Sequence, residues 1–270
     1  MRFTHLLAAA AVVLAAPVAA HDGHDEQHSL DEVLAMELRN DDRARDQYRH
    51  PAETLAFFQV EPTMRVAEYA PGGGWYTRVL VPWIAPHGQY IGLNRDSGAR
   101  EEGAASWGDQ FVAAIAESGM ATADAIMAFE SDEIPEGVAG TADRVLIFRS
   151  MHGLMNGNAA DAELRAIRTL LADDGMVGVV QHRAPETASY AEASGTRGYM
   201  RQSDVVRLFE LHGFELVAES EINANPNDPA DWEGGVWTLL PVLRFGDEDR
   251  ERYEAIGESD RMTLLFRKRD

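Results

Sequence analysis

An acidic residue followed by a run of glycines is the feature of this sequence that most clearly points to chemistry. Residues 66–77 read VAEYAPGGGWYT, between an apolar stretch typical of a strand and one typical of a helix. Gly72, Gly73 and Gly74 would let the backbone approach a ligand closely and adopt positive φ angles. Glu68, at the end of the strand, favours a ligand with a cationic end or sugar hydroxyls and disfavours a bare phosphate.

The composition excludes several other kinds of chemistry. The chain has 270 residues, with 24 Lys and Arg against 45 Asp and Glu, a formal net charge of −21, and no Cys. Such acidity disfavours nucleic-acid partners, which require a basic surface. The absence of cysteine excludes disulfides, thiolate metal sites and thiol nucleophiles. The single lysine, Lys268, lies far from the glycines, so no lysine-containing phosphate-binding loop is present.

The N-terminus has the pattern of an export signal. Residues 1–20 combine Arg2, an apolar stretch and a small-residue cleavage site, which predicts a signal peptide and a periplasmic or secreted protein. The apolar stretch is too short for a membrane span, which needs about 20 residues. Residues 21–28 form a leader with three histidines. This leader is either a solvated acidic tail or a metal-binding segment; no other metal site is predicted.

Strand and helix periodicities alternate after residue 60, which predicts an α/β protein with a doubly wound, mostly parallel sheet of about seven strands. Residues 29–57 are expected to be helical, with Ser29 as N-cap, a break at Arg49-His50-Pro51 and a short helix that begins at Pro51. A long connection, about residues 220–260, forms an insertion before the last strand, within a domain of residues 29–270. The predicted strands are Arg65–Tyr69, Gln89–Leu93, Ala125–Phe129, Arg144–Phe148, Met176–Val180, Phe214–Ala218 and Thr263–Phe266; the predicted helices are Trp75–Ile84, Trp107–Glu117, Asn158–Ala172 and Ser203–His212.

The glycine segment and the motifs after it resemble those of the class I S-adenosylmethionine-dependent methyltransferases, in a branch of predicted exported proteins. Glu68, Ala70, Gly72 and Gly74 stand in the places of that superfamily's acid-x-Gly-x-Gly-x-Gly motif, with Ala70 replacing its first glycine. The resemblance covers roughly residues 45–220 and the last strand. It implies a Rossmann-like sheet with an antiparallel last strand, and S-adenosylmethionine as cofactor.

The same resemblance implies further cofactor-binding residues. Asn94 occupies the place of the acid that binds the ribose hydroxyls, and Asp132 the adenine-contacting place. Arg149 and His152 follow the fourth strand, where ligands bind in open α/β sheets. Arg149 either pairs with a carboxylate of substrate or cofactor or neutralises acidic surface. His152 is either a catalytic base or a packing residue.

The function implied is methyl transfer to an unidentified small molecule, and two alternatives stay open. One is a catalytically silent periplasmic protein that binds a small ligand on the same scaffold. The other is a metal-handling protein that works through its leader. Trp232 and Trp237 of the insertion either line a substrate pocket or anchor the loop. The stretch Arg43–Arg49 either reaches the cofactor's amino-acid end or forms a solvated helix face. The sequence does not determine the oligomeric state.

Overall fold

The sheet has the topology expected from the resemblance. The computed structural model describes residues 28–101 and 103–269. The sheet order is β3-β2-β1-β4-β5-β8-β7, with β1 to β5 parallel, β8 antiparallel to both neighbours, and the short β6 paired with β5. The strands are β1 (Arg65–Tyr69), β2 (Gln89–Asn94), β3 (Ile126–Glu130), β4 (Ala142–Phe148), β5 (Leu171–Ala184), β6 (Met200–Arg201), β7 (Phe214–Ser220) and β8 (Arg261–Lys268).

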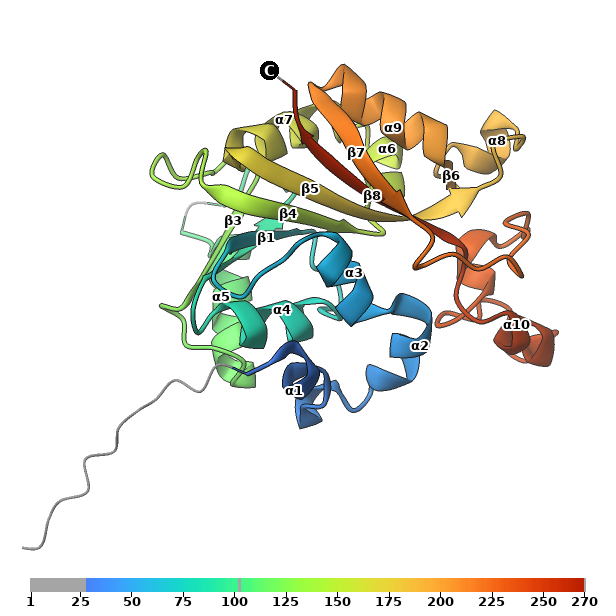
Figure 1. Cartoon of the computed structure of the whole chain (residues 1–270), viewed down its shortest axis with the longest axis horizontal. Helices are drawn as coiled ribbons and strands as arrows, with labels where there is room; N and C mark the ends of the chain where they lie inside the picture. The colour runs from blue at the N-terminus through green and yellow to red at the C-terminus, as the bar shows by residue number, and fades with distance from the viewer. Residues whose placement is uncertain (1–27, 102, 270) are drawn as a thin grey trace, which may run out of the picture.

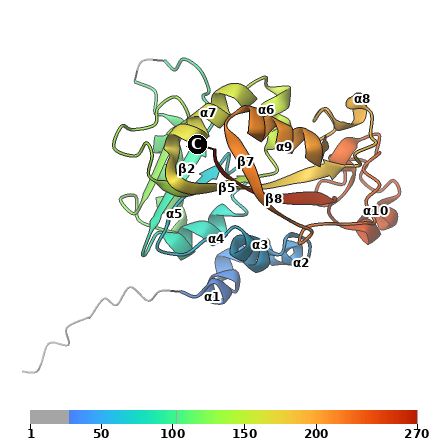
Figure 2. The ribbon, with the colours of Figure 1, turned by 45° about the horizontal axis from the view of Figure 1, so that its top comes forward.

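Helices cover both faces of the sheet, as Figures 1 and 2 show. On one face α6, α7 and α9 bury an apolar cluster that includes Leu164 and Phe209, and on the other α1, α3, α4 and α5 bury one that includes Leu80 and Ile115. The α-helices are α1 (Leu30–Leu34), α2 (Asp46–Arg49), α3 (Pro51–Phe57), α4 (Thr77–Ile84), α5 (Trp107–Ser118), α6 (Met151–Asn156), α7 (Ala160–Leu170), α8 (Tyr190–Ala193), α9 (Gln202–Leu211) and α10 (Arg250–Ile256). The predicted fold class is confirmed.

Two helical predictions need correction. Asn158 was expected to cap the helix after the fourth strand, but α7 has Ala159 at its N-cap and no side-chain cap. Asn158 instead adopts a φ of 48° directly after α6, a conformation that asparagine tolerates better than most residues. The prediction missed α6 altogether, because its six residues are too few to show helical periodicity.

The N-terminal segment is helical only in short pieces. Ser29 caps α1 as predicted: its hydroxyl accepts from the Glu32 amide and the Glu32 carboxylate accepts from the Ser29 amide. After α1 come two short 3₁₀ helices, η1 (Glu37–Arg39) and η2 (Arg43–Arg45), and then α2. The segment is not one continuous helix: His50 adopts a φ of 41°, and α3 begins at Pro51, as predicted.

The insertion between β7 and β8 packs at the carboxyl ends of the parallel strands; in Figure 1 it is the segment that carries the label α10. It holds the 3₁₀ helix η3 (Gly235–Thr238) and α10, and it has an apolar cluster of its own that includes Trp232, Leu239 and Tyr253. Since β8 runs antiparallel to β5, the end of the insertion comes next to His182.

The predicted signal peptide and the leader up to residue 27 lie outside the described residues. Within the part of the chain that the structure describes, no helix has the length and apolar character to cross a membrane. The same part contains no cluster of three or more His, Cys, Asp or Glu side chains placed to hold a metal ion.

Candidate active site

The glycine bend between β1 and α4 leaves open space for a ligand. Ala70, Gly72 and Gly74 have φ angles of 50°, 57° and 74°, so the chain turns through left-handed conformations. A Cβ atom built on Gly73 would meet no heavy atom within 4 Å, and Gly73 lines a cavity. At Gly73 the bend is therefore not filled by the protein's own side chains, whereas the Arg78 side chain packs against Gly74.

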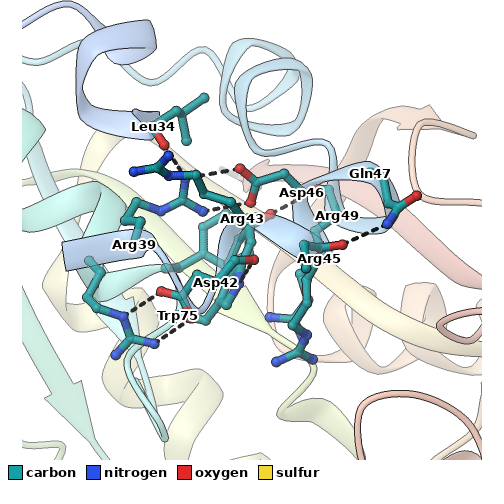
Figure 3. A network of polar contacts seen from close by, with 12 residues as sticks. Leu34, Arg39, Asp42, Arg43, Arg45, Asp46, Gln47, Arg49 and Trp75 are labelled. Atoms are coloured by element: carbon teal, nitrogen blue, oxygen red, sulfur yellow. Dashed lines mark hydrogen bonds and ion pairs between the residues drawn. The ribbon is translucent and has the colours of Figure 1, made fainter. Parts of the chain in front are cut away.

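Contacts from the N-terminal segment hold the bend in place. Arg78 of α4 donates from Nη1 to the Gly73 carbonyl at 2.9 Å and from Nη2 to the Asp42 carboxylate at 2.8 Å. Asp42 in turn accepts through its carbonyl oxygen from the indole N–H of Trp75 at 3.3 Å. Figure 3 shows Asp42 beside Trp75. The backbone that lines the cavity is thus preorganised by three fixed polar contacts.

Glu68 is a buried carboxyl group at the carboxyl end of β1. It is 2% exposed, and its Oε2 accepts hydrogen bonds from the hydroxyls of Tyr90 at 2.7 Å and Thr77 at 2.8 Å. Burial raises the pKa of Glu68 to about 7, although both hydroxyls and the charge of Arg78 oppose that rise. Glu68 can therefore change its charge near neutral pH, and a cation beside it would favour the ionised form.

A cavity of about 350 Å³ opens beside the bend, at the carboxyl ends of β1, β4 and β5. This is the size of a pocket for a metabolite. Its apolar wall includes the aromatic rings of Tyr76 and Phe148, which stack 3.5 Å apart, and Trp237 from the insertion. Its polar lining consists of Arg45, Glu68, Arg78, Arg149, Ser150, His152, His182, Glu258 and Ser259.

A second hollow of about 300 Å³ lies next to this cavity and shares part of its wall. Both the cavity and this hollow are lined by Ala70, Arg149, Ser150 and His152. The hollow is also lined by Arg95, which comes directly after β2. An elongated ligand could therefore extend from the cavity across the end of β1 toward β2.

Two histidines face the cavity, and both are held neutral. Burial is the main cause that lowers the pKa of His152 and of His182. The His182 Nδ1 lies 2.6 Å from the Ser259 hydroxyl, and the His152 Nδ1 lies 3.5 Å from Gln181 Nε2. The His152 ring packs edge-on against Trp237, with centroids 6.0 Å apart. An uncharged His152 has a ring nitrogen available to accept a proton.

Arginines gather around one carboxylate that lines the cavity. Glu258 pairs with Arg45 at 2.6 Å, with Arg49 at 3.0 Å and with Arg261 at 2.9 Å. Arg45 and Arg49 come from the same short segment, shown in Figure 3, and the Arg49 guanidinium also lies 4.6 Å from the Trp75 ring centroid. Arg45 and Arg49 of the stretch Arg43–Arg49 thus contribute to the site, whereas Arg43, Ala44 and Gln47 are exposed to solvent.

Most of the predicted site residues come together, and two lie apart. Six line the cavity: Glu68, Ala70, Gly72, Gly73, Arg149 and His152. Gly74 completes the same bend. Neither hollow is lined by Asn94 or Asp132. Asn94 lies at the end of β2, and Asp132 is exposed.

The buried acid at the end of β3 is Glu130 and not Asp132. Glu130 is 1% exposed, pairs with Arg100 and accepts from the Ser97 amide at 3.0 Å. The roles given to Asn94 and Asp132 stay predictions.

Sequence reasoning missed the contribution of β5 and of the insertion. No recognisable motif surrounds the cavity-lining residues that these elements contribute, His182, Glu258 and Ser259. Trp232 and Trp237 were each expected either to line a pocket or to anchor the insertion. Trp237 lines the cavity. Trp232 anchors the insertion, since its indole N–H donates to the Asp228 carboxylate at 2.8 Å. The one sequence feature that pointed to a part of this polar cluster was the arginine-rich stretch 43–49, which contains Arg45.

The chain is similar in fold to known proteins but not in sequence. No protein-family model and no curated protein sequence matches this chain. Among solved structures, a putative sarcosine dimethylglycine methyltransferase from Galdieria sulphuraria superposes with a TM-score of 0.53 at 14% identity, over 89% of this chain and 90% of that one. The fold is that of the S-adenosylmethionine-dependent methyltransferases.

Two further structures show how broad this similarity is. A methyltransferase of the same cofactor class from Aquifex aeolicus superposes with a TM-score of 0.50 at 13% identity, over 73% of this chain and 94% of that one. The [4+2]-cyclase SpnF superposes with a TM-score of 0.52 at 14% identity, over 82% of this chain and 80% of that one. At these identities the likeness establishes the methyltransferase fold and leaves the reaction to be argued from the site.

Proposed function

We propose that this protein binds S-adenosylmethionine beside the glycine bend and transfers its methyl group to a small molecule. The observation that carries the proposal is the open bend next to the buried Glu68, at the end of the first strand of a methyltransferase fold. An ionisable carboxyl group there complements a ligand that carries positive charge.

The residues around the cavity fit such a cofactor, which when bound supplies a methyl group on a positively charged sulfur. Gly72 and Gly73 would hold it through the backbone, and Glu68 would face its positive charge. Val236 and Trp237 of the insertion line the cavity, where they would limit the access of water to a bound ligand. Since methyl transfer needs alignment more than covalent help, these residues act mainly by positioning.

His152 is the residue that we propose to accept a proton from the methyl acceptor. It lies at the start of α6, it lines both hollows, and it is uncharged at neutral pH because burial lowers its pKa. Its packing against Trp237 fixes the ring at the wall of the cavity. A proton released by the acceptor could therefore move to this ring.

A leucine at position 73 should block the cofactor without disturbing the fold. Gly73 has no left-handed φ and no neighbour near its missing Cβ, so the new side chain can project into the cavity. We expect Gly73→Leu to weaken S-adenosylmethionine binding at least about tenfold by calorimetry. Gly72→Val would be a poorer probe, because the φ of 57° at Gly72 strains any side chain.

Gly137→Leu is the matched control. Gly137 is also exposed, without a left-handed φ and without a heavy atom near its missing Cβ, but it lies in the turn before β4, outside the cavity. Gly137→Leu should bind the cofactor like the wild type. Equal affinities for Gly73→Leu and the wild type would place the cofactor elsewhere.

A silent ligand-binding protein is the second candidate. It is favoured by the amide of Asn94, which stands in the place that the resemblance gives to a ribose-binding acid. Transfer of a labelled methyl group from S-adenosylmethionine to any member of a metabolite panel would exclude it. Micromolar binding with no transfer to any acceptor would support it.

We also propose that the protein is exported, on the basis of residues 1–20. An exported enzyme would depend on cofactor made in the cytoplasm. N-terminal sequencing of the protein from fractionated cells tests export, since a mature protein that begins at His21 is expected, and a cytoplasmic protein that begins at residue 1 would contradict it.

A further inference from the structure

The part of the cavity lining around Glu258 carries more positive than negative charge. Arg45 and Arg149 line the cavity, and Arg49 and Arg261 reach Glu258 from within the protein. Three guanidinium groups thus pair with one carboxylate, and Arg149 adds a fourth positive charge whose field also acts on Glu68, in a chain whose formal net charge is −21. An arginine is ionised at any ordinary pH, so this local excess persists.

Several donors in this cluster have no partner. Four buried nitrogen atoms make no hydrogen bond with the described residues: Nη1 and Nη2 of Arg49, Nη2 of Arg45 and Nε of Arg261. Arg49 is 1% exposed and Arg261 2% exposed. Arg149 lines both hollows, and residue 149 adopts a φ of 56° at the cavity wall. Leaving buried N–H donors of charged groups without acceptors is costly unless a further acceptor completes the site.

The rest of the wall indicates what kind of molecule would carry that anion. The stacked Tyr76 and Phe148 rings, Trp237, Leu240 and Val242 give the cavity an apolar side. Planar guanidinium groups match a carboxylate or phosphate through paired hydrogen bonds. A compact apolar body with one oxyanion would satisfy both sides of the cavity.

We propose that the cavity binds a small molecule through an oxyanion, a carboxylate or a phosphate, held by Arg45 and Arg149. Assigning this anion to the methyl acceptor rests on the proposed function, whereas the anion site itself does not. The other possible source of the same chemistry is the amino-acid carboxylate of the cofactor. The two sources differ in whether a free anion and the cofactor bind together or compete.

Calorimetric titration with benzoate and with inorganic phosphate tests the site. Wild-type protein should bind at least one probe, and Arg149→Gln or Arg45→Gln should weaken that binding about tenfold or more. Arg165→Gln is the matched control, since Arg165 is a surface arginine of α7, 67% exposed and paired with Asp161. It should leave probe binding unchanged.

Saturating S-adenosylhomocysteine distinguishes the two sources. If the anion belongs to the acceptor, benzoate binds with unchanged or improved affinity in its presence. If benzoate and S-adenosylhomocysteine compete, the arginines hold the cofactor's carboxylate and the assignment to the acceptor is overturned. Failure of S-adenosylhomocysteine to bind, with benzoate still bound, would refute the proposed function and leave the anion site intact.

A measurement on the wild type keeps the proposal testable if the arginine substitutions unfold the protein. Benzoate or phosphate should raise the melting temperature of the wild type as its concentration increases, and that of Arg165→Gln to the same extent. No binding of either probe to the wild type and no rise in its melting temperature would overturn the anion site.

Discussion

Glu68→Gln is expected to make the protein more stable than the wild type at alkaline pH, and equally stable at acidic pH. Burial raises the pKa of Glu68 to about 7 from an ordinary value of 4.5. Between these two values the folded state holds a proton that the unfolded chain has released, so wild-type stability falls as the pH rises. Above the folded pKa the full penalty, on the order of 3 kcal/mol, is present.

The glutamine carbonyl can still accept from Tyr90 and Thr77, so the hydrogen bonds of the site are kept. Urea unfolding at about pH 5 and about pH 9 measures the difference between the two proteins. We expect Glu68→Gln to weaken cofactor binding at the alkaline pH, the opposite of its effect on stability. A stability difference that does not change with pH would show that Glu68 does not titrate in this range.

Glu258→Gln should be among the most destabilising polar substitutions in this protein. Its carboxylate is 4% exposed and compensates three guanidinium groups, those of Arg45, Arg49 and Arg261. Removing one partner of a buried ion pair typically costs about 3–5 kcal/mol, because the remaining charges stay buried. We expect a loss of that size in the free energy of unfolding, measured with urea.

Glu221→Gln is the control for this loss. Glu221 accepts two hydrogen bonds from Arg183 but its side chain is 69% exposed, so water can replace the lost partner. Its substitution should cost about 1 kcal/mol or less. Similar losses for the two variants would mean that the Glu258 cluster is no more important to stability than a surface ion pair.

The sequence predicted the fold well because its signals are local. Apolar runs located all seven strands of the main sheet path, and the strand–glycine–helix pattern located the end of β1. Boundaries were less accurate. β5 extends from Leu171 to Ala184, well beyond the predicted Met176–Val180, since its ends pair with β4, β6 and β8 irrespective of local composition.

The site was only half predictable, because much of it is built from distant segments. Arg45 and Glu258 are 213 positions apart in the chain and meet only because the insertion folds back over the carboxyl ends of the strands. No spacing rule links such residues. Near the end of β3 two acids, Glu130 and Asp132, are two positions apart, and local pattern cannot show that only Glu130 is buried.

The central claim is that the glycine bend is the seat of an adenosyl cofactor, and amide hydrogen exchange tests it most directly. Exchange would be followed by mass spectrometry with and without saturating S-adenosylhomocysteine. We predict slower exchange in peptides that cover residues 68–78, because the bound ligand would shield the amides of Gly72 and Gly73. Unchanged exchange in this segment, with protection appearing elsewhere, would contradict the account.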